Sequence, residues 1–399
     1  MGKHINDAYI VSAVRTPIGR APRGMFKNVR PDDLLIHTLN GILKENPQLD
    51  PRDVDDVIIG CAVPEGEQGA DIARAAVLLS GFPESVPGVT VNRFCSSGLQ
   101  SVAMAANSIK VGEADIVIAG GVESMSTLPM YGLKPSFNPV VFDSEATYGM
   151  TYSMGIGAEL IAGERNISRE EQDGYALRSH QKALDAIEKG DFKDEILPFE
   201  IIRSLPDVDK GAVCKTQKTA DTDEGPRAET SMEALGKLRP VFDAKGSVTA
   251  GNSSQMSDGA ATVLLCSETA LRKYNFTPMA RFVHYAVSAV KPEYFTIAPV
   301  TAIRKVLKLT GLPLDEFGWI ELNEAFASQS LAVIKEMNLD MDKVNPVGGA
   351  IALGHPLGCT GAKLTATLVH AMKRHNIKYG MVSMCVGFGM GAAGVFELA

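Results

Sequence analysis

The chain has 399 residues, which allows two or three domains of ordinary size and a large buried core. Hydrophobic residues make up 45% of it and charged residues 22%, a balance typical of a folded protein rather than a disordered one. The formal net charge is −8 and no basic cluster stands out, so nucleic acid is not an expected partner.

The sequence predicts neither export nor membrane insertion. Residues 1–7 lead directly into the strand-like residues 8–11 (AYIV), without the charged and apolar regions of a signal peptide. The longest uncharged stretch, residues 379–396, contains five glycines and predicts a strand with a glycine loop rather than a membrane span. We therefore expect no integral membrane segment and a cytoplasmic protein.

The cysteine pattern argues against metal binding and against a disulfide framework. None of the six cysteines forms a C-x-x-C pair, so we expect reduced thiols. His355 and Cys359 have the spacing of metal ligands on a helix, but Pro356 and Gly358 lie between them and argue against that helix. No metal site is predicted.

In chain order, short apolar runs that end at turn residues alternate with segments of helical periodicity. Four of these runs predict strands: residues 57–60, 89–92, 116–120 and 381–384. Strands that alternate with helices in this way indicate an α/β fold.

The segment between the third and fourth strands changes character and predicts an inserted loop domain. It is rich in proline and aromatic residues at first and strongly polar later. Its one clear helix begins with a capping box formed by Ser168 and Glu171 and ends at Gly190.

The parts on either side of the insertion resemble each other. Residues 57–62 parallel 320–325, and the strand, helix and strand within 91–118 parallel those within 344–383. We interpret this as a duplicated βαβ-rich unit, although two βαβ units can also look alike by chance. The predicted domains are an N-terminal half (1–120 plus 250–270), a loop domain (121–249) and a C-terminal half (271–399).

Cys95 is the first candidate for chemistry, because it lies at a predicted turn from a strand into a helix. The start of a helix presents free N–H groups and partial positive charge, which favour a thiolate of low pKa and hence a nucleophile. The alternative is that Cys95 is a small buried hydrophobic residue.

A base for this nucleophile is found in an irregular segment. His355 lies within residues 345–361, which contain five glycines, and Pro356 restricts the backbone directly after it. A phosphate-binding loop would use glycines similarly, but the spacing of neither common phosphate motif is present.

Two further polar candidates end predicted strands. Cys385 is followed by Gly387 in a glycine-rich segment whose N–H groups are suited to an oxyanion hole, although a tight turn would explain the glycines as well. Asn323 follows a predicted strand over 319–322, where a carboxamide orients a water or a carbonyl, or caps the next helix.

Five motifs together resemble those of the thiolase family, in the family's order and across almost the whole chain. They are residues 92–98 (NRFCSSG), 251–254 (GNSS), 323–326 (NEAF), 354–361 (GHPLGCTG) and 385–387 (CVG). The resemblance implies a five-layered αβαβα fold of two similar halves with an inserted loop domain.

The resemblance also implies a role for each candidate residue. Cys95 becomes the acyl-accepting nucleophile, His355 the base that activates it, and Cys385 the acid and base for the α-proton of acetyl-CoA. Asn323 would hold a water that binds the enolate oxygen together with His355. The backbone N–H groups of Cys95 and Gly387 would stabilise the tetrahedral intermediate.

For coenzyme A the resemblance points to four residues. Arg227 would lie near the nucleotide and Ser254 near the pantetheine, while Met154 and Phe326 would line the thiol end. Coenzyme A is then a substrate, and no permanently bound cofactor is expected. The implied assembly is a homodimer or homotetramer that binds acyl-CoA and CoA, with a possible association with a hydratase/dehydrogenase subunit of β-oxidation.

Departures from the family pattern bear on the substrate. Phe388 replaces a glycine that often follows Gly387, and Phe94 replaces a smaller or polar residue. Ser153 stands where members dedicated to acetoacetyl-CoA commonly carry histidine. Ser153 leaves more room beside Met154, so we predict a 3-ketoacyl-CoA thiolase of fatty acid β-oxidation, with longer chains than acetoacetyl-CoA as substrates. Phe94 and Phe388 oppose longer chains, because either ring would close the tunnel if it pointed inward.

The main alternative is a biosynthetic acetyl-CoA C-acetyltransferase. A ketosynthase would pair its cysteine with two histidines or with histidine and asparagine, so Cys385 argues against it. A non-catalytic acyl-CoA or lipid carrier on the same fold is a distant alternative, because the catalytic motifs are intact.

Overall fold

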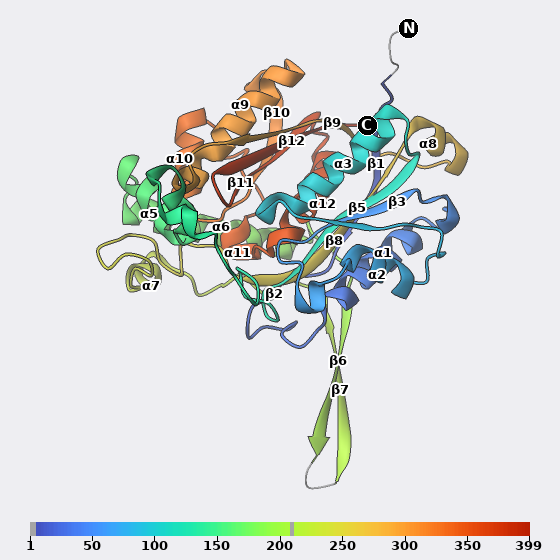
Figure 1. The fold of residues 1–399 in the computed structure, drawn as a ribbon, viewed down its shortest axis with the longest axis horizontal. Helices are drawn as coiled ribbons and strands as arrows, with labels where there is room; N and C mark the ends of the chain where they lie inside the picture. The colour runs from blue at the N-terminus through green and yellow to red at the C-terminus, as the bar shows by residue number, and fades with distance from the viewer. Residues whose placement is uncertain (1–4, 208–210) are drawn as a thin grey trace.

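A computed structural model describes residues 5–207 and 211–399 as a layered α/β protein (Figure 1). The strands of the N-terminal half are β1 (Tyr9–Arg15), β2 (Gly19–Arg20), β3 (Asp56–Gly60), β4 (Val89–Val91), β5 (Ile116–Ser124) and β8 (Ser257–Cys266). Those of the C-terminal half are β9 (Ala280–Ala289), β10 (Phe317–Leu322), β11 (Tyr379–Val386) and β12 (Met390–Leu398). They run in the order β4-β3-β5-β8-β1-β9-β12-β11-β10, and β1 and β9 join the halves through two residue pairs.

The two halves have the same sheet topology. The order β3-β5-β8-β1 in one half matches β10-β11-β12-β9 in the other, and each series begins with a parallel pair followed by an antiparallel one. The match extends to the loops, because Gly60 pairs with Val91 and Ile320 with Val344, both in parallel. The predicted two similar halves are therefore confirmed. Their boundaries stay a prediction, and β5 continues past residue 120 to Ser124.

Five layers follow from where the helices bury their apolar faces. Helices α1 (Pro31–Glu45) and α2 (Ile72–Leu79) cover the outside of one sheet, and α9 (Ala298–Thr310) and α10 (Ala327–Met337) cover the outside of the other. Helices α3 (Ser97–Val111) and α12 (Leu357–His375) lie in the middle layer and pack in one core with residues of both sheets. Helix α8 (Glu268–Tyr274) follows β8.

The two central helices touch at glycines near their first turns. A Cβ atom on Gly98 would lie 2.6 Å from the backbone nitrogen of Ala362, and one on Gly361 would lie 2.1 Å from that of Leu99. Real Cβ atoms do not approach other atoms this closely, so only glycine permits this contact. The beginnings of α3 and α12 are thereby held together.

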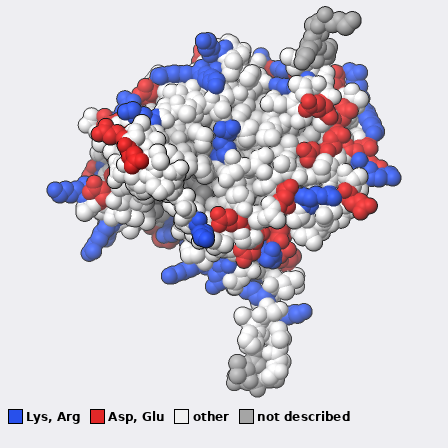
Figure 2. Space-filling view, in the orientation of Figure 1, with Lys and Arg blue, Asp and Glu red and all other residues white. Residues whose placement is uncertain are grey.

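The inserted region contains α4 (Glu145–Tyr148), α5 (Met154–Glu164), α6 (Arg169–Lys189), β6 (Phe199–Asp207), β7 (Ala212–Ala220) and α7 (Met232–Gly236). The predicted capping box of Ser168 and Glu171 and the left-handed cap at Gly190 are both present on α6. Strands β6 and β7 form a hairpin that projects from the body (Figure 1), and on the face in Figure 2 the blue side chains of its described part lie near its base.

Two local expectations are corrected and one is confirmed. The segment 345–361 is not irregular throughout, because it contains α11 (Ala350–Leu353) and the start of α12. Pro356 caps α12 from outside, so Gly358 and Cys359 are helical, although His355 is not and the two form no metal pair on one helix. Residues 379–396 form the predicted strand (β11) and glycine turn, and then most of a second strand, β12, which was not predicted.

Within residues 5–207 and 211–399, no helix is both long and apolar enough to cross a bilayer. Nor do three or more histidine, cysteine, aspartate or glutamate side chains gather in that part of the chain as a metal site would require.

Candidate active site

Both halves of the protein and the inserted region contribute to one mostly apolar cavity. The predicted residues Cys95, His355, Cys385 and Gly387 line it. The predicted thiol-end contacts Met154, Ser254 and Phe326 line the same cavity. Seven of the nine predicted site residues are thus brought together, and Asn323 contacts His355 directly behind the wall.

A strained turn presents Cys95 to the cavity. The turn Phe94–Ser96 connects β4 with α3, and Phe94 has a positive φ of 45°. Hydrogen bonds hold this conformation: the Phe94 N–H donates to Asn92 Oδ1 (2.8 Å), and the Ser97 hydroxyl accepts from the Arg93 N–H (2.8 Å) and donates to the Phe94 carbonyl (2.7 Å). The motif NRFCSSG therefore encodes a tight turn at which Cys95 lines the cavity.

The expected low pKa of Cys95 is wrong. Burial raises the pKa of the Cys95 thiol to about 12, and the charge of Glu123 raises it further. Hydrogen bonding from the backbone N–H groups of Gly387 and of Cys95 itself acts in the opposite direction without overcoming the desolvation. Cys95 is consequently a protonated thiol at rest and needs a base at the moment of reaction.

His355 is held in the tautomer that such a base requires. Its Nδ1 lies 2.6 Å from Thr360 Oγ1, and that hydroxyl donates its own hydrogen to the Pro356 carbonyl at 2.8 Å. Thr360 Oγ1 can therefore only accept from His355, which places the imidazole hydrogen on Nδ1. The lone pair on Nε2 remains for proton transfer, and Asn323 Nδ2 lies 3.3 Å from it.

The surroundings of His355 also keep it neutral. Burial lowers the pKa of His355 to about 3, and the nearby Lys363 ammonium lowers it in addition. Lys363 is itself buried, with its Nζ 3.4 Å from the Gly354 carbonyl. A neutral imidazole and a neutral thiol thus line the same cavity, which suits a proton transfer that creates charge only during the reaction.

Cys385 and Gly387 come from the end of β11 and the turn after it. Burial raises the pKa of the Cys385 thiol well above its ordinary value, and a charge on Cys95 would raise it further. The two sulfur atoms are therefore close enough for a charge on one to affect the pKa of the other. The Gly387 N–H hydrogen-bonds toward the Cys95 sulfur, so the predicted pair of N–H donors meets at one thiol.

Asn323 follows β10 and is fixed through its backbone, whose N–H donates to the Ser383 carbonyl at 2.9 Å. Its side chain is buried, and its Oδ1 has no hydrogen-bond partner among the residues that the structure describes. A buried amide oxygen without a partner is costly, and a bound water or substrate group would satisfy it.

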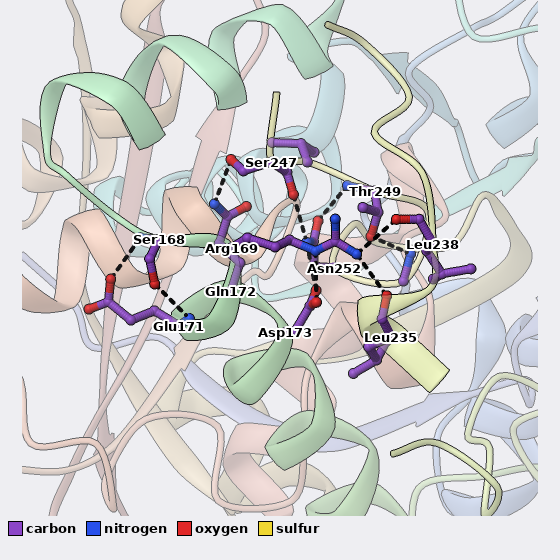
Figure 3. A network of polar contacts seen from close by, with 12 residues as sticks. Ser168, Arg169, Glu171, Gln172, Asp173, Leu235, Leu238, Ser247, Thr249 and Asn252 are labelled. Atoms are coloured by element: carbon purple, nitrogen blue, oxygen red, sulfur yellow. Dashed lines mark hydrogen bonds and ion pairs between the residues drawn. The ribbon is translucent and has the colours of Figure 1, made fainter. Parts of the chain in front are cut away.

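Ser254 is positioned by a polar network around the start of α6 (Figure 3). The Asn252 amide donates to Asp173 Oδ1 (3.0 Å) and to the Ser247 carbonyl (3.1 Å), and Asn252 Oδ1 accepts from the Thr249 N–H (2.8 Å). The Ser254 N–H then donates to the Ala325 carbonyl at 2.9 Å. The GNSS motif thus ties the inserted region to the loop after β10.

Arg227 lies in a second hollow rather than in the cavity with Cys95. His180, Leu235, Gln255 and Ile351 are among the residues that line this hollow with it. The Arg227 N–H donates to His180 Nδ1 at 3.2 Å, and burial lowers the pKa of His180 to about 4. Because Gln255 adjoins Ser254 in the chain, the two hollows are neighbours.

Sequence reasoning missed several contributors, among them Thr360, Met130 and Tyr131. Thr360 belongs to a motif that was singled out, yet its contact with His355 depends on the helical turn that Pro356 was expected to prevent. Met130 and Tyr131 line the cavity from a part of the insertion without periodicity, where no signal marked them.

Another missed residue is Glu123, a buried carboxylate on β5. It accepts from the N–H groups of Ala62 (2.8 Å) and Gly358 (2.8 Å) and from Gln68 Nε2 (2.6 Å). It therefore fastens the start of α12, and with it the His355 segment, to the end of β3. An isolated glutamate in an apolar strand could have signalled this.

The comparisons with known proteins agree with this geometry. The 3-ketoacyl-CoA thiolase of Bacillus subtilis is 50% identical over 394 residues, covering 99% of this chain and all of that one. The crystal structure of the Bacillus anthracis acetyl-CoA acetyltransferase superposes with a TM-score of 0.89 at 39% identity, with both chains covered completely. Human mitochondrial 3-ketoacyl-CoA thiolase in complex with CoA gives a TM-score of 0.88 at 39% identity, with 99% of each chain covered. The thiolase N-terminal domain model matches residues 8–269 and the C-terminal domain model residues 276–398, so the chain belongs to the thiolase family of acyltransferases.

Proposed function

We propose that the protein is a 3-ketoacyl-CoA thiolase of fatty acid β-oxidation, which cleaves 3-ketoacyl-CoA with CoA to acetyl-CoA and a shortened acyl-CoA. One observation carries the proposal: Cys95, His355 and Cys385 line a single cavity in which the N–H groups of Cys95 and Gly387 face the Cys95 sulfur. Nucleophile, base, second acid and oxyanion donors are thus present together.

In the first half-reaction, His355 Nε2 takes the proton of the Cys95 thiol and the thiolate attacks the C3 ketone. The backbone N–H groups of Cys95 and Gly387 stabilise the negative oxygen of the tetrahedral intermediate. The C2–C3 bond then breaks, and its electron pair becomes the enolate of the acetyl-CoA thioester. The acyl group remains on Cys95.

The enolate is stabilised and then protonated. A water on Asn323 and the protonated His355 share the enolate oxygen, which would satisfy the orphaned Asn323 Oδ1. The Cys385 thiol donates its proton to C2, and acetyl-CoA leaves.

In the second half-reaction, CoA enters and the Cys385 thiolate removes the proton of its thiol. The CoA thiolate attacks the acyl group on Cys95, and the same two N–H groups stabilise the oxyanion. Acyl-CoA leaves, and His355 returns its proton to the Cys95 sulfur, so every group regains its starting state.

The two neighbouring hollows fit the shape of CoA. We place the nucleotide near Arg227 and His180, and the pantetheine past Ser254 toward Met154 and Phe326. The cation at one end and the apolar lining at the other match an anionic nucleotide and a thioester.

A second candidate, acetyl-CoA C-acetyltransferase, is favoured by one observation. Phe94 and Phe388 pack edge to face with 5.1 Å between ring centroids and stand in the wall of the cavity, which would shorten the space for an acyl chain.

Assembly and location are part of the proposal. The edge strand β4 leads directly to the Cys95 turn, and its Val89 is 37% exposed, which supports a homodimer or homotetramer closed along this edge. The proposed reaction requires Cys95 and Cys385 as free thiols, which favours a reducing compartment such as the cytoplasm. Association with a hydratase/dehydrogenase subunit stays a prediction.

The decisive experiment mixes the protein with acetoacetyl-CoA and CoA and follows the absorbance of the enolate. We expect a loss of signal that depends on CoA and that Cys95→Ser abolishes. Loss without CoA would indicate a hydrolase, and no loss would favour a carrier; either result would contradict the proposal.

A further inference from the structure

The segment of the inserted region that follows Met130, a residue of the cavity lining, carries exposed apolar side chains, which we call the strip. It consists of Tyr131, Leu133, Phe137 and Val140, whose side chains are 40% to 62% exposed. Tyr131 also lines the cavity, so the strip is continuous with the site. Exposed apolar surface next to a binding site is where an apolar ligand extends beyond it.

Two aromatic rings form the cavity wall on the side where Phe137 of the strip lies. Phe94 and Phe388 line the cavity and meet at a right angle. Phe137 packs against Phe388 with 6.3 Å between centroids, and it is absent from the cavity lining, so it supports Phe388 from outside. The wall is therefore two rings thick at Phe388, and its outer ring belongs to the inserted region.

The inner rings stand on strained backbone. Phe94 has a φ of 45° and Phe388 a φ of 62°, a region that residues with a side chain rarely adopt. Such conformations persist only where neighbouring groups hold them. Phe137 is the neighbour of Phe388 on the open side, so it contributes to holding that ring across the end of the cavity.

We propose that Phe137 is a specificity-determining residue that holds Phe388 as a movable stop for the acyl chain. Short 3-ketoacyl chains end at Phe388. Longer straight chains displace that ring and lie along the strip, with their distal methylenes on Leu133 and Val140. The proposal rests on the proposed thiolase function and names its substrate class as acyl chains too long for the closed cavity.

The test compares kcat/KM for thiolysis of substrates with 4, 8, 12 and 16 carbons in the wild type and in Phe137→Ala. An edge-to-face aromatic contact is worth roughly a two- to tenfold change in an equilibrium. We expect the ratio of 16-carbon to 4-carbon kcat/KM to rise by about that factor, since Phe388 then moves aside more easily. Phe137→Trp, which thickens the wall, lowers the same ratio.

Phe142→Ala is the matched control. Phe142 is exposed in the same segment but packs against Tyr148, with 6.3 Å between centroids. It should leave the ratio unchanged. An equal shift in Phe142→Ala, or an unchanged or lowered ratio in Phe137→Ala, overturns the proposal.

Two further outcomes are distinguishable. If Phe137→Ala changes the mass in analytical ultracentrifugation and not the ratio, the strip is a subunit interface and the proposal is wrong. If the wild type fails to cleave the four-carbon substrate with CoA, the proposed thiolase function itself has failed, before chain length enters.

Discussion

Thr360 provides the sharpest test of how the base is prepared. In Thr360→Val the methyl group preserves the volume but removes the oxygen that accepts the hydrogen of His355 Nδ1. A buried donor without a partner costs about 1–3 kcal/mol. If that cost falls on the reactive orientation of the imidazole, kcat drops by about 5- to 150-fold with little change in KM.

Helix α12 supplies a matched control for this change. Thr365 is equally buried and donates to the Gly361 carbonyl at 2.8 Å, just as Thr360 donates to Pro356, yet His355 is not its partner. Thr365→Val therefore removes the same kind of hydrogen bond within the helix and should retain activity. Thr360→Ser keeps the hydroxyl and should retain the activity that Thr360→Val loses. Steady-state kinetics and ¹⁵N chemical shifts of the imidazole report rate and tautomer. Equal activity of the two valine variants would refute the reasoning.

Three other predictions concern the ionisable groups. Cys385→Ala should still form acyl-enzyme at Cys95, detectable by mass spectrometry, while thiolysis falls by about 10²–10⁴-fold; near-normal thiolysis would exclude its acid and base role. Because the pKa of Cys95 is raised to about 12, its alkylation by iodoacetamide should accelerate about tenfold per pH unit between pH 7 and 10, whereas a plateau would indicate a thiolate at rest. His355 has its pKa lowered to about 3, so the unfolded chain binds a proton that the folded one does not, and stability is lost as pH falls below about 6.5. Between pH 7.5 and 4.5, the free energy of unfolding measured with urea should fall by about 2–3 kcal/mol less in His355→Asn than in the wild type. Equal decreases in the two proteins would disprove the assignment.

The sequence was sufficient to predict the α/β class, the two similar halves and the cavity residues that belong to its motifs. Several of the site residues lie at the ends of strands, and in a duplicated sheet the ends of equivalent strands lie at the same edge. Asn323, Cys385 and the turn at Cys95 were all found by this rule.

What could not be predicted depends on contacts across the fold. Glu123 interacts with Gly358, a residue more than two hundred positions away. The local sequence around either residue does not indicate this contact. The pKa of Cys95 was predicted in the wrong direction because local reasoning counts the N–H groups at a helix start but not the depth of burial. Phe137 reaches Phe388 only through an aperiodic segment, whose path local propensity does not determine.

The glycine contact between α3 and α12 has a consequence for how the site tolerates mutation. Gly98 and Gly361 set the spacing of two helices, and the nucleophile and its base are attached just before the first turn of each. The distance between the nucleophile and its base is thereby set by two helix backbones in van der Waals contact. No side chain lies between them at these glycines that could adjust to a change. A single methyl group at Gly98 or Gly361 would push the two helices apart and so separate the nucleophile from its base. The reaction therefore tolerates added volume at these interior positions as poorly as substitutions at the reacting atoms.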